Sequence, residues 1–425
     1  MKGMTLPEGP PTRPLGAGSF QTRCHDLSVQ LAASLAGQPE HAFPQAALDA
    51  LRRSGWWGAG LPRRVGGPGL DACELLGLLQ AVGRASLPLG RLFEGHVNAL
   101  ALVSAYADAE QTRRTAQDAQ RGHLFGVWNT EAHDGLRLIC PPEGSAPLML
   151  QGAKTFASGG LHVTRPLLPA EGPGGRQLVL LRTEDPNTLM REQEGSWQPL
   201  GMSATHSVRL DFSGSAVQRG DLIGAPGDYY RQPMFSAGAL RFCAVQLGGA
   251  TTLLAETVGY LHTLGRSGDE VQQLRFAPVW QGLQAASLAL AEAERLERAC
   301  ASGQVPQARL LAQVDAVRLA TEDACLALLE ACERAVGARG LLEPWPFSRL
   351  IRDLRMYLRQ PAPDAARLRL GRWVLEELNS PDADSSDTDS LDVNGSDADS
   401  SDTSDTSVPD AAQRPDSEMQ RRASP

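Results

Sequence analysis

The sequence predicts an α+β protein that is mostly helical, with an N-terminal helical domain, a middle antiparallel β domain and a C-terminal four-helix bundle. Helical periodicity occupies the first and last parts of the chain, whereas the segment between them alternates apolar and polar residues with a period of two. Breaks rich in Gly and Pro separate these parts. With 425 residues and 42% hydrophobic content, the chain is long enough to bury a large core.

The first predicted domain spans residues 20–121. Stretches such as "LLGLLQAVGRASLPLGRLF" and "ALALVSAYADAEQTRRTAQDAQRG" have helical periods that Gly and Pro interrupt. The preceding residues, 1–19, are rich in Pro and Gly, and we expect them to be disordered.

The second predicted domain spans residues 122–227 and consists of short strands. In "SVRLDFSG" the apolar residues Val208, Leu210 and Phe212 alternate with polar ones. This alternation is typical of an antiparallel sheet that buries one face.

The third predicted domain, 228–378, returns to long helical periods. Apolar residues recur on two faces, namely Leu247, Ala250, Leu254, Val258 and Leu261 on the first and Val317, Ala320, Ala324, Leu328, Ala331 and Ala335 on the second. The small residues of the second face permit the close packing of a bundle. Residues 379–425 are a Ser/Asp-rich tail with little to bury, and we expect them to be disordered.

Charge and cysteine usage exclude several classes of function. The net charge of −9 belongs to the tail, so the body is electrically balanced, which argues against a nucleic-acid partner. The seven cysteines are dispersed without ligand spacing, as in reduced core thiols, and predict neither a disulfide framework nor a metal site. No apolar run is long enough for a membrane span, and we expect a cytoplasmic protein.

The stretch "LQGAKTFASGG", residues 150–160, combines a strand, an aromatic residue, a serine and two glycines. The glycines let the backbone approach another group closely, and the serine offers a hydroxyl at the same place. From this segment alone, a hairpin edge with a solvated Lys154 is the simpler interpretation.

Five stretches in the order of the chain resemble the acyl-CoA dehydrogenase superfamily of flavoproteins. They are "LPRRVGGPGL" at 61–70, the strand with Trp128, Asn129, Thr130 and Glu131, "KTFAS" at 154–158, the β element at 200–224, and "PFSRLIRD" at 346–353. The last resembles the family signature P-x-x-R-x-x-R-D. The resemblance extends over nearly all of residues 20–378.

The resemblance implies a flavin site on the β domain. Phe156 would form an apolar wall beside the flavin ring, and Trp128 would lie on the strand under it. Ser158 and Thr130 would offer hydrogen-bond donors near flavin N5 and the pyrimidine edge, where reduction gathers negative charge. The implied cofactor is FAD, with FMN as the alternative.

The resemblance also implies that each site is shared between two subunits. Gln272 and Arg275, together with the turn from Gly337 to Gly340, would reach the adenosine and pyrophosphate of a partner's cofactor. We therefore expect a homodimer or homotetramer. The bland interpretation of these residues is an exposed arginine and an ordinary turn at a helix end.

Dehydrogenation of an acyl thioester requires a carboxylate that removes the α-proton. The family places a Glu about eight residues beyond the Arg-Asp signature or on the first bundle helix, and neither position carries an acid here. The catalytic residue is therefore unknown. The candidate proton donors are His162, His206 and Tyr357, and a structural role is the alternative for each histidine.

Three functions remain open. The first is a flavin-dependent dehydrogenase acting on an acyl-CoA or a similar small substrate, with an electron-transfer partner. The second is a flavin-dependent monooxygenase that takes reduced flavin from a reductase and uses oxygen; the stretch "RSGDEVQQLRFAPVWQGLQAA" resembles that branch. The third is a non-catalytic flavin-binding or scaffold relative. We rank the dehydrogenase first because most of the superfamily performs that reaction, which is an argument from the fold.

Overall fold

The computed structural model describes residues 19–141, 147–359 and 362–376. The two segments that we expected to be disordered, 1–19 and 379–425, therefore lie outside the described residues, apart from Ser19. Ser19 begins the first helix, because its side chain accepts a hydrogen bond from the backbone N–H of Thr22 at 3.2 Å.

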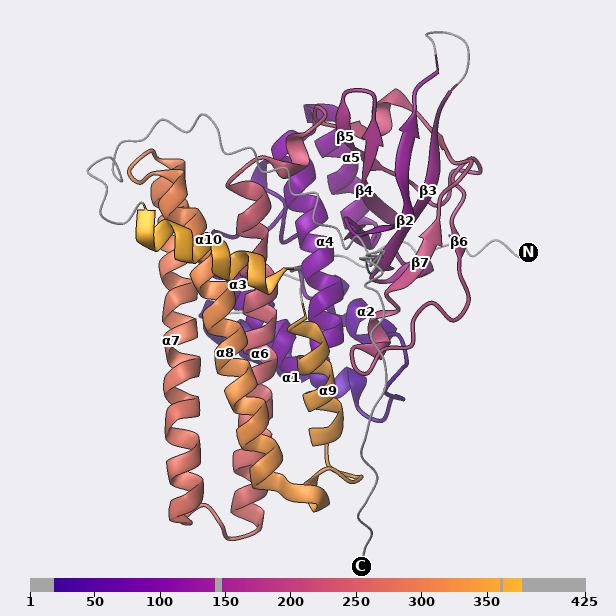
Figure 1. The fold of residues 1–425 in the computed structure, drawn as a ribbon. Helices are drawn as coiled ribbons and strands as arrows, with labels where there is room; N and C mark the ends of the chain where they lie inside the picture. The colour runs from indigo at the N-terminus through magenta and orange to yellow at the C-terminus, as the bar shows by residue number, and fades with distance from the viewer. Residues whose placement is uncertain (1–18, 142–146, 360–361, 377–425) are drawn as a thin grey trace, which may run out of the picture. The chain divides into compact units, whose positions relative to one another are not determined.

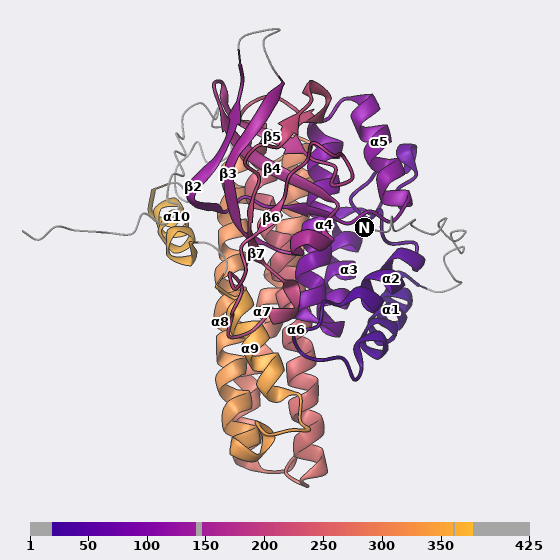
Figure 2. The same ribbon diagram turned by 90° about the vertical axis from the view of Figure 1, so that its right-hand side faces the viewer.

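The N-terminal part is helical, as predicted. Its helices are α1 (Phe20–Leu35), α2 (Gln45–Arg53), α3 (Ala72–Ala85), α4 (Leu87–Tyr106) and α5 (Ala109–Gln120), with a 3-10 turn η1 at Arg63–Val65. α4 is buried along most of its length, because it lies between the sheet and the bundle helix α6 (Figures 1 and 2). α3 approaches α6 closely at Gly83, where a Cβ would lie 2.3 Å from the carbonyl oxygen of Val245.

The middle part is one sheet. Its strands are β1 (Phe125–Val127), β2 (Glu131–Ile139), β3 (Leu148–Ala157), β4 (Arg165–Gly172), β5 (Gly175–Leu180), β6 (Arg191–Glu192), β7 (Val208–Asp211), β8 (Ala216–Val217) and β9 (Leu222–Ile223). Short 3-10 turns lie at η2 (Gly160–His162), η3 (Ser203–Thr205), η4 (Arg219–Asp221) and η5 (Asp228–Tyr230).

We predicted an antiparallel sheet, but the sheet is mixed. The strand order is β6-β7-β3-β2-β4-β5-β9, with β8 pairing with β3 and β1 pairing with β4. β1 and β4 are parallel, and β2 also makes a parallel bridge to β4. The chain reaches β4 only after the β2–β3 hairpin, so it returns to β1 by a crossover that sets the strands parallel. The predicted inward face is confirmed, since Val208, Leu210 and Phe212 are buried.

The C-terminal part is a helical bundle. It consists of three long helices, α6 (Met234–Thr263), α7 (Glu270–Ala301) and α8 (Gln307–Gly340), the shorter α9 (Phe347–Tyr357), and α10 (Pro363–Glu376), which lies across α8 (Figure 1). The predicted apolar faces point inward except at Val258, which is 40% exposed.

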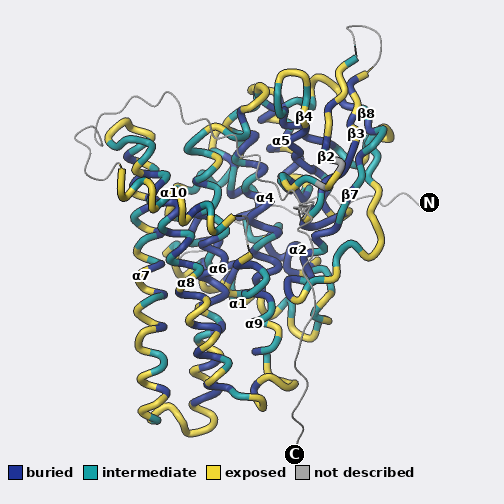
Figure 3. Tube along the Cα trace, viewed as in Figure 1, coloured by how far each residue is buried: buried dark blue, intermediate teal, exposed yellow. Residues whose placement is uncertain are grey.

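The hydrophobic core is continuous through the sheet, the N-terminal helices and the bundle, as the buried residues in Figure 3 show. The described residues belong to one compact unit. The boundaries at 121/122 and 227/228 therefore lie inside one compact unit. That they separate domains stays a prediction.

Candidate functional site

Two of the predicted site residues, Thr130 and Phe156, lie near each other, because Thr130 immediately precedes β2 and Phe156 is near the end of the paired strand β3. Glu131 pairs with Lys154 in the β2–β3 register, and the backbone N–H of Thr155 donates to the carbonyl of Thr130 at 3.2 Å. Phe156 has a φ of 50° and remains 50% exposed, and its ring meets Trp197 edge to face at 6.1 Å. A bulky residue in the left-handed region is strained, so the surrounding structure holds this ring at the surface.

Lys154 fixes the segment around Thr130 by two hydrogen bonds. Its Nζ donates to Oε1 of Glu131 at 2.5 Å and to the carbonyl of Asn129 at 3.3 Å, so it grips the residues on both sides of Thr130. Lys154 is 0% exposed, and burial, partly offset by Glu131, lowers its pKa to about 8. The predicted hairpin edge with a solvated Lys154 is therefore wrong: this lysine is an internal clamp.

Tyr230 and Arg176 make a second set of polar contacts with the same segment. Tyr230 Oη donates to the side-chain oxygen of Asn129 at 2.8 Å and accepts from Arg176 at 2.6 Å. Arg176 also lies 3.9 Å from Glu131, whose other oxygen accepts from the backbone N–H of Leu136 at 2.8 Å. Both oxygens of Glu131 are thus engaged, and exposed Thr130 lies on a preorganised segment.

Ser158 is buried, and its hydrogen bonds define which role it can play. Thr205 Oγ1 donates to the carbonyl of Met202 at 2.8 Å, so it must accept from Ser207 at 2.7 Å, and Ser207 must accept from Ser158 at 2.9 Å. The backbone N–H of Ser158 donates to the carbonyl of Phe156 at 2.8 Å. Both donors of Ser158 are used, so Ser158 presents an acceptor and not the donor that we expected.

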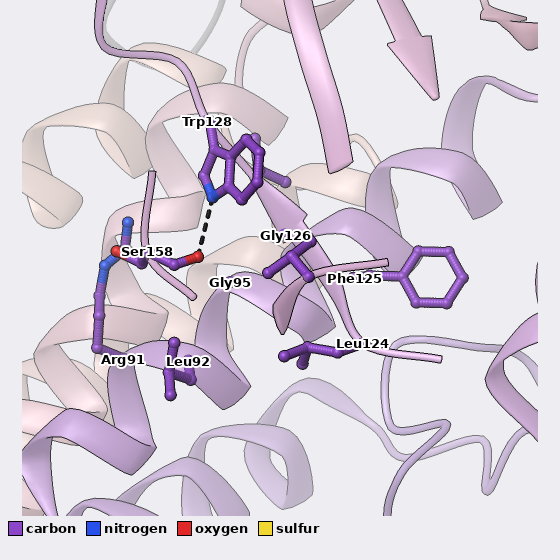
Figure 4. Close-up of a pocket in the computed structure, with 10 residues that line it drawn as sticks. Arg91, Leu92, Gly95, Leu124, Phe125, Gly126, Trp128 and Ser158 are labelled. Atoms are coloured by element: carbon purple, nitrogen blue, oxygen red, sulfur yellow. Dashed lines mark hydrogen bonds between the residues drawn. The ribbon is translucent and has the colours of Figure 1, made fainter. Parts of the chain in front are cut away.

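Trp128 is buried and supports this strand end. Its indole N–H donates to the carbonyl of Ser158 at 3.0 Å, as Figure 4 shows. A contact between Trp128 and a cofactor stays a prediction, as does the flavin-facing role of each of Thr130, Phe156 and Ser158.

A small cavity lies between this strand end and α4. Arg91 and Gly95 on α4 line it together with Trp128 and Ser158 (Figure 4). His96 on α4 joins two other segments: its Nδ1 accepts from the backbone N–H of Phe125 on β1 at 3.1 Å, and its Nε2 donates to the carbonyl of Trp57, in the loop after α2, at 2.8 Å. Burial lowers the pKa of His96 to about 3, so it is a neutral structural residue.

α4 also carries a buried carboxylate that the sequence reasoning missed. Glu94 is 2% exposed, and it accepts hydrogen bonds from Nη1 of Arg91 and Nδ2 of Asn98. Asn98 Oδ1 accepts from Arg241 on α6 at 2.9 Å. The available signal was an arginine, a glutamate, a histidine and an asparagine interspersed with apolar residues in the helical stretch "RLFEGHVN".

The Arg-Asp signature joins the bundle to the loop that follows β6. Asp353 accepts from the backbone N–H of Met202 at 2.5 Å, and Arg352 donates to the carbonyl of Leu200 at 3.2 Å. Between them lies Gly201, where a Cβ would lie only 2.1 Å from the carbonyl oxygen of Arg352. Burial raises the pKa of Asp353 to about 6. This clamp positions the loop whose Trp197 packs on Phe156.

The four bundle residues predicted to reach a cofactor lie elsewhere. Gln272 and Arg275 begin α7, Gly337 and Gly340 end α8, and the two helix ends lie together at the end of the bundle away from the sheet (Figures 1 and 2). Gln272 accepts from Arg275 at 2.7 Å. Gly337 has a φ of 59° and interrupts the helix. Within one chain, these residues are not brought to Phe156.

The three candidate proton donors fall into two groups. His162 stacks on Phe43 with ring centroids 3.7 Å apart, and His206 contacts the carbonyl of His41 at 3.0 Å. Tyr357, on α9, is buried and interacts electrostatically with Glu94 and Arg91. The described residues contain no cluster of His, Cys, Asp and Glu that could hold a metal ion.

The strand end fits the flavin that the sequence resemblance implies. A strained backbone keeps the flat apolar ring of Phe156 at the surface, the Thr130 segment is rigidly held beside it, and the Ser158 oxygen adds a polar contact. A planar cofactor with a polar edge requires such a wall and such partners.

Comparison with known proteins identifies the family. The family model for the N-terminal domain of acyl-CoA dehydrogenase matches residues 27–123, and the model for its C-terminal domain matches residues 240–359, together about half of the chain. The chain belongs to the acyl-CoA dehydrogenase family. The predicted mostly helical fold and the predicted flavoenzyme of the acyl-CoA dehydrogenase type are confirmed at this level.

Individual relatives perform different reactions. The chain is 24% identical to dibenzothiophene monooxygenase of Mycolicibacterium goodii, covering 77% of this chain and 86% of the relative. It is 23% identical to mitochondrial isobutyryl-CoA dehydrogenase of Dictyostelium discoideum, covering 78% and 82%. The structure of the dibenzothiophene monooxygenase TdsC from Paenibacillus sp. A11-2 with FMN and indole has a TM-score of 0.74 at 23% identity and covers 84% and 97%. These similarities place the chain near the monooxygenase branch.

Proposed function

We propose that the protein is a flavin-dependent monooxygenase that uses reduced flavin and oxygen on a small-molecule substrate. The observation that carries this proposal is that the two carboxylates beside the site are already hydrogen-bonded to other protein groups. Glu94 is bound by Arg91 and Asn98, and Glu131 by Lys154, Arg176 and a backbone N–H. A base that removes an α-proton must lie within hydrogen-bond reach of the substrate, whereas every oxygen of these two carboxylates already accepts a hydrogen bond from the protein.

The Ser158 relay supports a flavin that becomes reduced at this site, which both candidate reactions share. Reduced flavin carries a hydrogen on N5, and the hydrogen bonds of Ser158 leave its oxygen as an acceptor. When bound, the flavin would supply the redox chemistry. Of the protein's own groups, Phe156 would support the ring, Thr130 would contact its polar edge, and the Lys154 clamp would hold both strands in place.

The relatives favour the same branch. The dibenzothiophene monooxygenases and the FMN complex of TdsC suggest FMN beside FAD as the cofactor, and we infer that a flavin reductase supplies it reduced. The predicted cytoplasmic location also belongs to this proposal. None of the helices in the described ranges is both long and apolar enough to span a bilayer.

Dehydrogenation of an acyl-CoA is the second candidate, favoured by the similarity to isobutyryl-CoA dehydrogenase. It requires a base that the two engaged carboxylates do not provide.

One experiment separates the two candidates. The protein is loaded with FAD or FMN and titrated anaerobically with acyl-CoAs of different chain lengths while flavin absorbance is recorded. The monooxygenase proposal predicts no bleaching. It also predicts that chemically reduced flavin, mixed with the protein and air, gives an oxygenated product from an aromatic thioether or indole probe. Bleaching by an acyl-CoA would establish the dehydrogenase instead.

We also propose that the chain forms a homodimer through the outer face of α7. This face exposes Val271, Leu274, Trp280 and Leu288, and residues 276–291 contain no charged side chain. An uncharged apolar face on a helix is matched by an identical face across a two-fold axis. Arg275 and the kink at Gly337 lie at the end of the bundle where α7 begins, and they would reach the partner's cofactor there, whereas Gln272 is buried and accepts a hydrogen bond from Arg275.

A further inference from the structure

Tyr230 joins the candidate cofactor strand to the start of the helical bundle. It is the last residue of the turn η5, and three residues separate it from Met234, where α6 begins. Its Oη donates at 2.8 Å to the side chain of Asn129, the residue before Thr130. One side chain therefore connects two segments that lie 101 positions apart in the sequence.

The direction of this hydrogen bond is fixed by a second partner. Arg176 Nη1 lies 2.6 Å from Tyr230 Oη, and a guanidinium can only donate, so the single proton of the hydroxyl points to Asn129. The Arg176 guanidinium also lies 5.6 Å from the centroid of the Tyr230 ring. Burial raises the pKa of Tyr230, so the hydroxyl keeps the proton that it donates.

The ring of Tyr230 is held by the first turn of α6. Phe235 on α6 packs against it with ring centroids 5.0 Å apart, and Tyr229 meets it edge to face at 4.9 Å. Tyr229 also meets Phe235 edge to face at 5.3 Å, which closes a cluster of three rings. Such contacts fix the distance and the tilt of the rings, so a shift of the first turn of α6 moves the Tyr230 hydroxyl.

The turn η5 is anchored without the help of that hydroxyl. The backbone N–H of Gly227 donates to the carbonyl of Arg176 on β5 at 2.8 Å. Asp228 is 6% exposed and accepts from the backbone N–H of Ala225 at 2.7 Å. Removal of the Tyr230 hydroxyl should therefore leave the turn in place and release only its two polar partners.

Asn129 transmits this position to Thr130. The Asn129 side chain is held by Tyr230, and its carbonyl accepts from Lys154 Nζ at 3.3 Å. Thr130 is exposed, and its carbonyl accepts from the backbone N–H of Thr155 at 3.2 Å. The orientation of the Thr130 side chain, which we expect to contact the polar edge of the flavin, thus depends on where Asn129 is held.

We propose that Tyr230 is a positioning residue that couples the first turn of α6 to flavin binding at Thr130, acting through Asn129. Flavin binding stabilises this turn, and a disturbed turn weakens flavin binding by the same factor, because coupling between two sites is reciprocal. This inference rests on the flavin site of the proposed function and concerns the regulation of that site.

The test is a double-mutant cycle on flavin affinity, with FMN and FAD as the titrants and flavin fluorescence as the signal. Tyr230→Phe removes the hydroxyl and keeps the ring contacts. Asn129→Leu removes the side-chain acceptor and keeps the carbonyl that Lys154 binds, and a third variant carries both changes. The control is Tyr260→Phe, the same exchange near the other end of α6, where the ring packs on Phe347.

Each single variant should weaken flavin binding about fivefold to tenfold, the effect of one lost hydrogen bond. The double variant should bind no more weakly than Asn129→Leu alone, because both changes break the same link, and the control should bind as the wild type does. Effects that multiply in the double variant, or wild-type affinity in Tyr230→Phe, would overturn the proposal.

Hydrogen exchange supplies a readout that a merely structural role of Tyr230 would not move. In the wild type and the control, flavin should slow exchange of the backbone amides of residues 234–240 about tenfold. Tyr230→Phe should lose this slowing even at a flavin concentration that saturates the site. If the slowing persists in this variant, the first turn of α6 senses the cofactor by another route and the proposal is wrong.

The outcomes separate this coupling from the proposed reaction. A wild type that oxygenates its substrate, with variants whose effects are independent, refutes the coupling and leaves the monooxygenase standing. A coupled cycle in a protein whose flavin is bleached by an acyl-CoA refutes the monooxygenase and retains the coupling. A wild type that binds neither FAD nor FMN refutes both.

Discussion

The strand end around Phe156 and the far end of the bundle were both predicted to contact the cofactor, yet they differ in how completely one chain builds them. At the strand end, Lys154, Tyr230 and Arg176 engage the groups on both sides of Thr130. At the bundle end, Arg275 contacts only its neighbour Gln272 among the described residues, and Gly337 has open space around it.

This difference indicates that the strand end depends on contacts within one chain, whereas the bundle end depends on a second copy of the chain. A region whose polar groups are satisfied internally is preorganised before a ligand binds. A region whose groups remain open next to an exposed apolar helix face acquires its partners from a second copy. The strand end should therefore respond to substitutions within one chain, and the bundle end to the oligomeric state.

The largest effect is expected at Lys154. Lys154→Met leaves Glu131 partly buried with the more distant Arg176 as its positive partner and the Leu136 N–H as its hydrogen-bond donor, and it releases the carbonyl of Asn129. We expect a loss of about 3 to 5 kcal/mol in the free energy of unfolding and loss of flavin retention. Urea unfolding and the flavin content after gel filtration measure both. The control is Lys154→Met with Glu131→Gln, which should recover much of the stability; full flavin binding by the single variant would break the comparison.

The link between the two regions is tested through Asp353. Its pKa is about 6 in the folded chain and about 3.9 when unfolded, so the folded state binds the proton more tightly. The contribution of Asp353 to stability is therefore present below about pH 4 and is lost as the pH rises through 6, by up to about 3 kcal/mol. Asp353→Asn stays neutral and can still accept from Met202, so its unfolding free energy relative to wild type should rise between pH 4 and pH 7. Parallel pH profiles would mean that the clamp does not titrate.

The bundle end is tested by charging α7. Leu274 and Leu288 are 78% and 70% exposed, so Leu274→Lys with Leu288→Lys should leave the fold of the chain intact. Two lysines facing their copies across the two-fold axis should weaken dimerisation by a hundredfold or more, about 3 kcal/mol. Analytical ultracentrifugation measures the change. Leu375→Lys on α10, at a leucine that is 87% exposed, is the control and should dimerise as the wild type does.

The order of the elements could be predicted from periodicity, and the family from the five motifs, because both are written in consecutive residues. The parallel pairing of β1 with β4 could not, since it depends on a crossover between segments 40 residues apart in the register Phe125 with Arg165. At the site, the motifs predicted Thr130, Phe156 and Ser158. They did not predict that Lys154 is internal or that Glu94 holds Arg91, because both depend on contacts across the fold.

The smallest effect is expected at Ser158. The sequence led us to expect a hydrogen-bond donor there, whereas its hydrogen-bond relay leaves an acceptor. Its hydroxyl donates to Ser207 and its N–H to Phe156, so its oxygen can only accept. If that oxygen meets the N5 hydrogen of reduced flavin, Ser158→Ala should weaken binding of reduced flavin about tenfold, roughly 1.4 kcal/mol, and leave oxidised flavin nearly unchanged. The flavin reduction potential of the variant should fall accordingly. Phe156→Ala should instead weaken both redox forms alike, because it removes apolar contact area. Equal losses for the two forms in Ser158→Ala would show that the serine acts only through the backbone of the strand end, and that its hydroxyl relay serves stability and not the cofactor.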